Sequence, residues 1–206
     1  MRVEELKKII ETSTGESEAQ KYFEKYPEVL RETLPYPHSR VVPQFQMGGE
    51  FIPDFVLTEG FSGGFRILLI ELEPPSCRIF NNDGTPAKRY NGAMKQVEEW
   101  RRFVELNRDY FLRRLSKAIK KRDLCYTIPG KGEEPTDSTG RYKLTNTEVS
   151  IHLNYAIIIS KRELLTSEDL LRKSSYMADR FETITYDRFI PTAQRCDKYR
   201  HVYEKD

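Results

Sequence analysis

The stretch Phe65-Arg66-Ile67-Leu68-Leu69-Ile70-Glu71-Leu72-Glu73 decides the fold of this chain. It is apolar on both faces until its last residues, which is typical of a central strand that is covered on both sides. Because side chains alternate along a strand, Glu71 and Glu73 point to one face and Leu72 points to the other. Pro74-Pro75 ends the strand, since proline has no amide hydrogen for the sheet ladder.

Two further strand-like segments, 41–47 and 50–58, precede this strand. Two glycine pairs, Gly48-Gly49 and Gly63-Gly64, separate the three segments. Glycine supplies the positive φ angles that tight hairpin turns require. The sequence therefore predicts an antiparallel meander of three strands.

Helical patterns flank the meander. Apolar spacing predicts short helices near 3–10, 17–26 and 28–34, and the stripe Ala93, Val97, Trp100 and Val104 predicts a helix that packs on the sheet and continues into 101–122. A buried strand at 155–159, a helix at 166–177 and a strand at 182–187 follow. Ser17 with Gln20, and Thr166 with Asp169, have the spacing of capping boxes that begin helices.

These elements predict one α/β domain over residues 1–206, with a three-strand antiparallel meander extended by further strands and flanked by helices. Helices occupy 1–40, and the core occupies 41–190. Segment 129–150 is rich in Gly, Thr, Ser and charge, which predicts a long mobile loop. Residues 191–206 are expected to form a polar tail.

The composition fits one soluble domain, with 206 residues, 38% of them hydrophobic, and 34 Lys plus Arg against 32 Asp plus Glu. No apolar run approaches the roughly 18 residues that span a bilayer, and the start lacks a secretory signal, so we expect a cytoplasmic protein without a membrane partner. Cys77, Cys125 and Cys196 are far apart, which favours reduced thiols over a disulfide framework or a zinc site.

Positive charge is concentrated in 101–122, where nine Lys and Arg residues stand against Glu105 and Asp109. Such a run indicates a polyanion partner. A solvated helix face whose cations only aid solubility is the alternative.

Carboxylates provide the strongest functional signal. Asp54 lies in the otherwise apolar segment 51–57, and a hairpin would bring it beside Glu71 and Glu73. Three hard oxygen donors at one sheet edge suit Mg²⁺ or Mn²⁺, which also relieves the repulsion between neighbouring carboxylates. The alternative is that Asp54 caps a strand and the glutamates lie in solvent.

These residues resemble a known family. Pro53-Asp54, Glu71-Leu72-Glu73 and Gln96 match the motif order of the PD-(D/E)XK nuclease superfamily, whose core is helix, three strands, helix, strand. A closer resemblance, to the nuclease domain of Shedu proteins, rests on five segments: Glu71-Leu72-Glu73-Pro74-Pro75, Arg78-Ile79-Phe80, the run from Ala93 to Arg101, Ile157-Ile158-Ile159-Ser160-Lys161-Arg162 and Thr183-Ile184-Thr185-Tyr186-Asp187. Shedu proteins are bacterial anti-phage defence nucleases. The resemblance implies a metal-dependent DNA endonuclease that forms a homo-oligomer.

The resemblance also implies roles for individual residues. Asp54 and Glu71 would be primary metal ligands. Glu73 stands where the superfamily usually has lysine, and would be a further ligand or would position the attacking hydroxide. Gln96 would orient the site. Lys88, Arg89 or Lys95 would supply the missing cation, and Glu18 could correspond to an accessory N-terminal acid.

Cations complete the expected nucleic-acid surface. Lys161 and Arg162 follow a buried strand and could hold phosphates, or could pair with Glu163 or Asp187. The full expected set is Arg101, Arg102, Arg113, Arg114, Lys117, Lys161 and Arg162. Because Glu73 replaces the lysine, the competing hypothesis is a catalytically inactive nuclease-fold module that binds nucleic acid or assembles with a partner.

Overall fold

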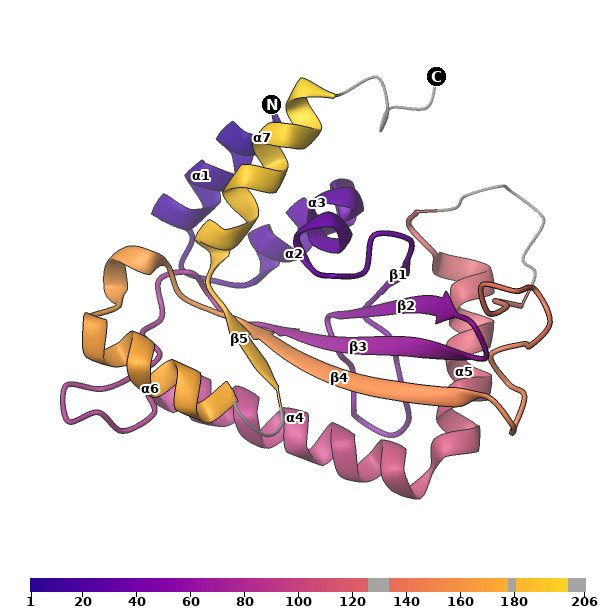
Figure 1. Cartoon of the computed structure of the whole chain (residues 1–206). Helices are drawn as coiled ribbons and strands as arrows, with labels where there is room; N and C mark the ends of the chain where they lie inside the picture. The colour runs from indigo at the N-terminus through magenta and orange to yellow at the C-terminus, as the bar shows by residue number, and fades with distance from the viewer. Residues whose placement is uncertain (126–133, 178–180, 200–206) are drawn as a thin grey trace.

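The computed structural model of the chain describes residues 1–125, 134–177 and 181–199. Its centre is strand β3 (Gly64–Leu72), the middle strand of a five-stranded sheet with the order β1-β2-β3-β4-β5 (Figure 1). β1 (Arg40–Pro43), β2 (Phe55–Phe61) and β3 pair antiparallel. β4 (Ser150–Ile158) and β5 (Glu182–Ile184) extend the sheet in parallel. The mixed α/β class, the meander and the central place of β3 are confirmed.

The first two strands differ from the expected ranges. β1 ends at Pro43, since Gln44 has a φ of 42° and leaves extended geometry. β2 begins only at Phe55 and continues to Phe61, because Pro53 has no amide hydrogen to donate to a neighbouring strand. Gly63 forms the β2–β3 turn at a φ of 82°, as predicted. The loop between β1 and β2 is therefore longer than a hairpin turn.

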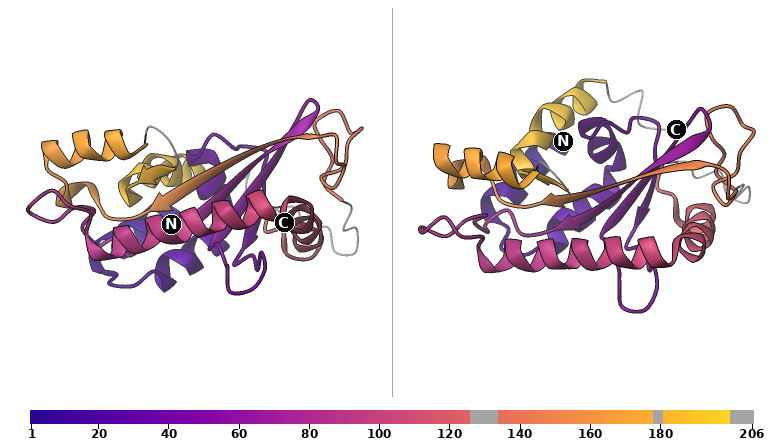
Figure 2. Two further views of the ribbon diagram at one scale, coloured as in Figure 1. Left: turned by 90° about the horizontal axis from the view of Figure 1, so that it is seen from below. Right: turned by 60° about the horizontal axis from the view of Figure 1, so that its bottom comes forward.

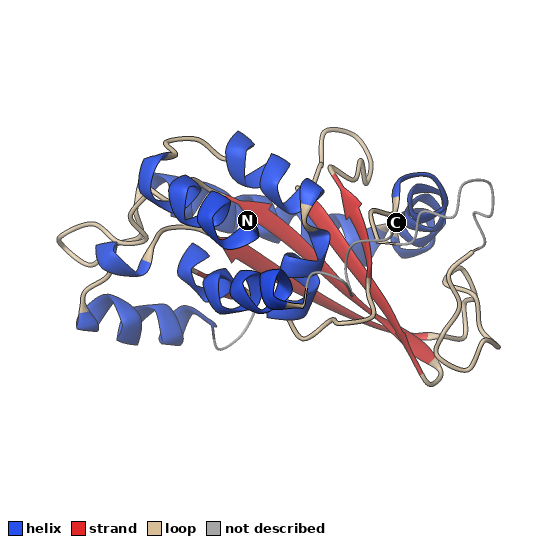
Figure 3. Ribbon diagram, turned by 90° about the horizontal axis from the view of Figure 1, so that it is seen from above, coloured by secondary structure: helices blue, strands red, loops and turns tan. Residues whose placement is uncertain are grey.

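Helices cover both faces of the sheet (Figure 2). One face carries α1 (Arg2–Thr12), α2 (Ser17–Lys25), α3 (Pro27–Thr33) and α7 (Ile190–Lys198), which Figure 3 shows from above. The opposite face carries α4 (Lys88–Leu106) and α5 (Arg108–Arg122). α6 (Ser167–Met177) lies between β4 and β5 in the chain.

The alternation of β3 divides the core in two. Leu68, Ile70 and Leu72 pack with α1, α2, α3 and α7. Ile67 and Leu69 face the other way and pack beneath α4 and α5. Glu71 and Glu73 continue this second set along the strand, so the fold directs both carboxylates toward the α4 side, as the alternation predicts.

The basic segment forms two helices rather than one. α4 ends at Leu106, and Asn107 adopts φ −129° and ψ 33° while its side-chain Nδ2 donates to the Phe103 carbonyl at 3.0 Å. The chain then turns into α5, which packs beside β1 (Figure 1). The prediction that the α4 helix runs unbroken through 101–122 is wrong, because the backbone of Asn107 leaves helical geometry.

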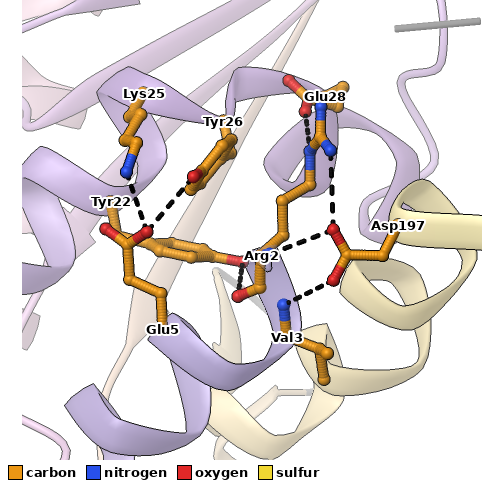
Figure 4. Close-up of polar contacts among 8 residues, drawn as sticks. All are labelled: Arg2, Val3, Glu5, Tyr22, Lys25, Tyr26, Glu28 and Asp197. Atoms are coloured by element: carbon orange, nitrogen blue, oxygen red, sulfur yellow. Dashed lines mark hydrogen bonds and ion pairs between the residues drawn. The ribbon is translucent and has the colours of Figure 1, made fainter. Parts of the chain in front are cut away.

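The expected polar tail begins as a helix. α7 packs on α1, with Thr192, Ala193 and Cys196 buried. Asp197 accepts hydrogen bonds from the Arg2 and Val3 amides, both at 3.0 Å, and lies 3.5 Å from the Arg2 guanidinium, which also binds Glu28 at 2.6 Å (Figure 4). This contact closes the open N-terminal end of α1. Residues 200–206 of the expected tail lie outside the described residues.

The described part of the expected loop, residues 134–149, contains no helix and only the isolated bridge Thr136–Lys143. Asp137 accepts hydrogen bonds from the amides of Gly63, Arg141 and Tyr142. These contacts hold the loop against the β2–β3 turn. Residues 129–133 lie outside the described residues, and the mobility of the loop stays a prediction.

One of the two predicted capping boxes is present, and the last strand is shorter than predicted. The Thr166–Asp169 capping box is present, with reciprocal side-chain to amide hydrogen bonds of 3.0 and 3.1 Å. The Ser17–Gln20 box is absent: α2 begins after Glu16, and Gln20 instead donates to Glu24 at 2.8 Å. β5 is shorter than predicted, since residues 186–189 turn into a 3₁₀-helix.

All three cysteines are free, as expected. Within the described residues, no helix has the length and hydrophobicity needed to cross a membrane.

Candidate functional site

Three carboxylates gather at the end of β3. Asp54 directly precedes β2, and its Oδ2 accepts a hydrogen bond from the Leu72 amide at 2.8 Å. Its own amide donates to the Ile70 carbonyl at 3.0 Å, which fixes it beside β3. Glu71 and Glu73 are both 8% exposed. The structure thus brings the three predicted acids together, rather than leaving the glutamates in solvent.

Glu71 is the most perturbed of the three. Burial raises the pKa of Glu71 to about 9, and the negative charges of Asp54, Glu73 and Glu16 act in the same direction. The hydrogen bond that Gln96 Nε2 donates to Glu71 Oε2, at 3.2 Å, opposes these effects on the pKa. Glu71 therefore holds a proton at neutral pH unless positive charge is supplied.

Burial also raises the pKa values of the other two acids, Asp54 and Glu73, which have different neighbours. Burial raises the pKa of Asp54 to about 6, against the lowering effect of the Leu72 amide. Burial raises the pKa of Glu73 to about 7, against the lowering effect of the Arg89 guanidinium. Three neighbouring acids with raised pKa values form a site where added positive charge is strongly favoured.

Arg89 is the cation that reaches this acidic group. Its Nη1 lies 3.6 Å from Glu73 Oε2, from the first turn of α4. Lys88 and Lys95 are exposed, and neither contacts the three acids within the described residues. The structure therefore selects Arg89 among the three cations that the sequence left open.

Gln96 and Tyr186 hold two of the acids in place. Gln96 lies two turns after Arg89 on α4, and its contact with Glu71 places it at the site, as predicted. Tyr186 is fully buried, and its hydroxyl donates to the Glu73 carbonyl at 2.9 Å. Tyr186 belongs to one of the Shedu-like segments, but nothing in the sequence indicated this contact, because it joins segments far apart in the chain.

Among the N-terminal acids, Glu16 is the one whose charge acts on the three acids, although its side chain is exposed like that of Glu18. The charge of Glu16 raises the pKa values of Asp54, Glu71 and Glu73. Glu18 is exposed and makes no hydrogen bond or ion pair with them in the described part of the chain.

A sequence signal for Glu16 existed. The buried face of α2 includes Ala19 and Phe23, and Glu16 precedes them by three and seven residues, which places it on the same side of the helix. Phe23 contacts Phe55 and Tyr186, two residues that adjoin the acids in sequence or in space. Extending this apolar stripe backwards would have pointed to Glu16.

The donor set fits a hard divalent cation such as Mg²⁺ or Mn²⁺, which prefers carboxylate oxygens. Glu73 Oε2 is buried and accepts no hydrogen bond from the described residues, and its ion-pair partner is the Arg89 guanidinium at 3.6 Å. The residues that the structure describes contain no group of three or more His, Cys, Asp or Glu side chains already placed to bind a metal ion.

The predicted nucleic-acid cations do not line this acidic group. Arg101 pairs with Glu105 at 3.0 Å and Arg102 pairs with Glu98 at 3.8 Å, both along α4. Arg114 donates to the Gln46 carbonyl at 3.0 Å. Arg113 and Lys117 are exposed on α5 and have no ion pair among the described residues. At 1.5 Å per residue, the end of α4 lies about 15 Å beyond Gln96.

The two cations that follow β4, Lys161 and Arg162, make contacts with acids of the same chain. Lys161 forms an ion pair with Glu163 at 3.3 Å, as the structural alternative predicted. The backbone amide of Arg162 donates to Asp187 at 2.6 Å, and the Arg162 side chain is exposed. Phosphate binding by this pair stays a prediction.

The raised pKa values predict how stability depends on pH. An acid whose folded pKa exceeds its unfolded pKa binds more protons in the folded state, so the free energy of unfolding falls as pH rises through that interval. For Glu71 the interval runs from 4.5 to about 9. Urea unfolding in EDTA at pH 5, 6.5 and 8 is expected to show a steady loss of stability.

Other acids should not mask this trend. Asp137, Asp169 and Asp197 have lowered pKa values, so they affect stability only at more acidic pH. Glu11→Gln, which changes an exposed acid on α1, should leave the pH slope unchanged. Stability that rises between pH 5 and pH 8 would contradict the raised pKa values of the three acids.

Comparison with known proteins identifies the family. No curated protein matches the chain. The family model described as Shedu protein SduA, C-terminal, matches residues 13–190. This range covers the five strands, the three acids, Arg89, Gln96 and Tyr186. Because the match extends over more than half of the sequence, the chain belongs to the Shedu protein SduA C-terminal family.

Proposed function

We propose that the chain is a metal-dependent endonuclease that hydrolyses phosphodiester bonds of DNA, with Asp54, Glu71 and Glu73 as its metal-binding residues. Membership of the Shedu family suggests a role in anti-phage defence. The observation that carries the proposal is the gathering of the buried Glu71 and Glu73 with the partly buried Asp54, all three with raised pKa values, beside Arg89 and Gln96. The order of helix, three strands, helix and strand supports a PD-(D/E)XK core.

The acids would hold Mg²⁺ or Mn²⁺, which supplies positive charge against the negative charge that develops on the phosphate. Arg89 places a guanidinium beside Glu73, where it can contact a phosphate oxygen as a lysine would in related sites. Gln96 orients the Glu71 carboxylate, and Tyr186 fixes the backbone of Glu73. These contacts keep the reacting groups positioned before DNA binds.

Cleavage of plasmid and linear DNA tests this proposal. The chain is expected to nick or cut DNA in Mg²⁺ or Mn²⁺ and to be inactive in EDTA. Asp54→Asn removes one charged ligand but keeps the side-chain shape, and it should remove activity. Glu11→Gln is the matched control on an exposed acid. Failure of the unmodified chain to cut any DNA form in either metal would contradict the proposal.

A second candidate function has its own support. The described residues lack a preassembled metal group, and Glu73 stands where related nucleases usually carry lysine. Both features fit an inactive module that binds nucleic acid or assembles with a partner. Calorimetry separates the two functions, because an active centre should bind Mn²⁺ and lose that binding in Glu71→Ala. An inactive module should give no binding heat in either protein.

A further inference from the structure

An exposed apolar surface lies where α4 meets α5. We call it the corner patch: it consists of the exposed residues Ile52, Leu106 and Tyr110 and the partly buried residues Phe51 and Phe103. The loop between β1 and β2 reaches past α4 beside α5 (Figure 2). Ring centroids lie 5.4 Å apart for Phe51 and Phe103, and 6.4 Å apart for Phe103 and Tyr110. The rings of Phe51, Phe103 and Tyr110 therefore form a row of contacts that joins three segments.

The patch concentrates exposed apolar surface to an unusual degree. Leu106 is 84% exposed, Tyr110 45% and Ile52 44%, and these are three of the six large apolar side chains exposed in the described residues. Gly48 makes the arrangement feasible, since a Cβ there would lie 2.6 Å from the Phe103 ring. Clustered exposed apolar groups usually mark a binding surface.

A stripe of cations on α5 begins at the same patch. Tyr110, Arg113, Lys117 and Lys121 follow one another at spacings of three to four residues, so they share a helix face about 16 Å long. The three cations are exposed and have no ion pair within the described residues. Asp109 is the single acid of α5. We call this face the α5 stripe.

Arg114 joins the two features. Its Nη1 donates to the Tyr110 hydroxyl at 3.2 Å, and its Cζ lies 5.6 Å from the centre of the Tyr110 ring. Its Nε donates to the Gln46 carbonyl at 3.0 Å in the loop that carries Phe51. The contacts hold the Tyr110 ring in place while leaving it partly exposed, as a stacking surface requires.

We propose that the corner patch and the α5 stripe together bind a single-stranded segment of nucleic acid, with unpaired bases on the rings of Phe103 and Tyr110 and phosphates on Arg113 and Lys117. Proteins that bind single strands combine these two elements, a cationic track for the backbone and aromatic rings for base stacking. A duplex offers the cations its phosphates but hides its base faces. The rings therefore favour unpaired nucleotides.

Charge argues against a second copy of the chain as the occupant. In a two-fold symmetric contact centred on the patch, the same surface faces itself, so the α5 stripe of one protomer would approach that of the other. The repulsion among these cations would disfavour the contact. A nucleic acid, in contrast, brings negative charge to the stripe and flat apolar surface to the rings.

This inference extends the proposed function, since it names the form of nucleic acid and the surface that holds it. The patch lies about 15 Å along α4 from Gln96, so it is separate from the acidic group. A DNA with an unpaired stretch could therefore occupy the patch while another part of it reaches the acids. Binding at the patch does not depend on cleavage.

Fluorescence anisotropy with a labelled DNA oligonucleotide, used as a single strand and as a duplex, tests the proposal in EDTA. The full chain should bind the single strand more tightly. Tyr110→Ala should weaken single-strand binding by about 5- to 100-fold while leaving duplex binding nearly unchanged, and Tyr110→Phe should retain the preference. Tyr199→Ala, at a tyrosine with a similar exposure of 44% outside the patch, is the matched control.

Substitution of the cations should affect DNA binding in a different way. Arg113→Ala and Lys117→Ala should weaken binding of both DNA forms, and each should reduce the slope of log affinity against log salt by about 0.7–0.9. Lys8→Ala, on α1, is the control for loss of an exposed cation. Thermal melts of every variant establish that lost binding does not reflect unfolding.

Three outcomes would overturn the inference. The first is equal affinity for single strand and duplex. The second is a Tyr110→Ala variant that binds like Tyr199→Ala. The third is no oligonucleotide binding at low salt together with self-association that Leu106→Asp disperses, which would make the patch a protein contact. Single-strand binding without cleavage would instead support this inference and contradict the proposed nuclease.

Discussion

Glu71→Gln is expected to remove DNA cleavage and, at the same time, to make the folded chain more stable. Cleavage should fall by roughly 100- to 1,000-fold, the loss typical of removing one group that acts on developing charge. The free energy of unfolding near pH 8 should rise by about 1–4 kcal/mol, since a buried acid is replaced by a neutral side chain of the same shape. The amide oxygen can still accept the hydrogen bond from Gln96.

The test is specific because cleavage and stability are expected to change in opposite directions. A residue that only supports the fold would lose activity and stability together, whereas a functional acid kept in an unfavourable environment shows a trade-off. Cleavage is measured on plasmid in Mn²⁺, and stability is measured by urea unfolding in EDTA at pH 8. The stability gain should shrink at pH 5, close to the pKa of 4.5 that Glu71 has in the unfolded chain, because folding then requires little proton uptake by Glu71.

Two results would contradict this account. Full cleavage by Glu71→Gln would place the reaction elsewhere in the chain. A variant that loses cleavage but is less stable at pH 8 would mean that Glu71 has a structural partner. Glu11→Gln, which changes an exposed acid on α1, should alter neither cleavage nor stability.

The centre of the fold was predictable because its signals are local. The apolar run of β3 specifies a covered strand, and Gly63 permits the turn at a φ of 82°. Side-chain alternation then places Glu71 and Glu73 on one face without further information. The pairing of β2 with β3 brings Asp54 to them, since a short turn fixes the register.

Features that depend on contacts between distant segments were not predictable. Nothing near Tyr186 in the sequence indicates that its hydroxyl meets the Glu73 carbonyl, 113 residues away. The choice of Arg89 over Lys88 and Lys95 depends on how α4 rotates against the sheet. α7 is short and polar in composition, and it is stabilised by packing on α1 rather than by its own propensity.

The backbone conformation of single residues determined where two of the elements end. The positive φ of Gln44 shortens β1, and Asn107 separates α4 from α5. Neither event changes the apolar pattern that predicted the elements. The break at Asn107 nevertheless matters for function, because it turns the cations of α5 away from the acidic group and creates the corner patch.

Trp100→Ala is expected to cause the largest loss of stability of the substitutions considered, about 3–5 kcal/mol. Trp100 is fully buried on α4 against the sheet, so truncation removes apolar contact and leaves a cavity. Domains of this size are typically stable by about 5–15 kcal/mol, so the variant should be marginal. The measurement is the midpoint of urea unfolding.

Matched variants on the same helix isolate the cause. Trp100→Phe keeps a ring and removes an indole nitrogen that has no hydrogen-bond partner among the described residues, so it should cost less than Trp100→Ala. Leu106→Ala, at a side chain that is 84% exposed, should cost under about 0.5 kcal/mol. Because Gln96 lies one turn before Trp100, loosening α4 should also weaken the contact with Glu71 and hence Mn²⁺ binding. A Trp100→Ala variant as stable as Leu106→Ala would show that α4 is not held on the sheet by this residue, and the placement of Gln96 at the acids would lose its support.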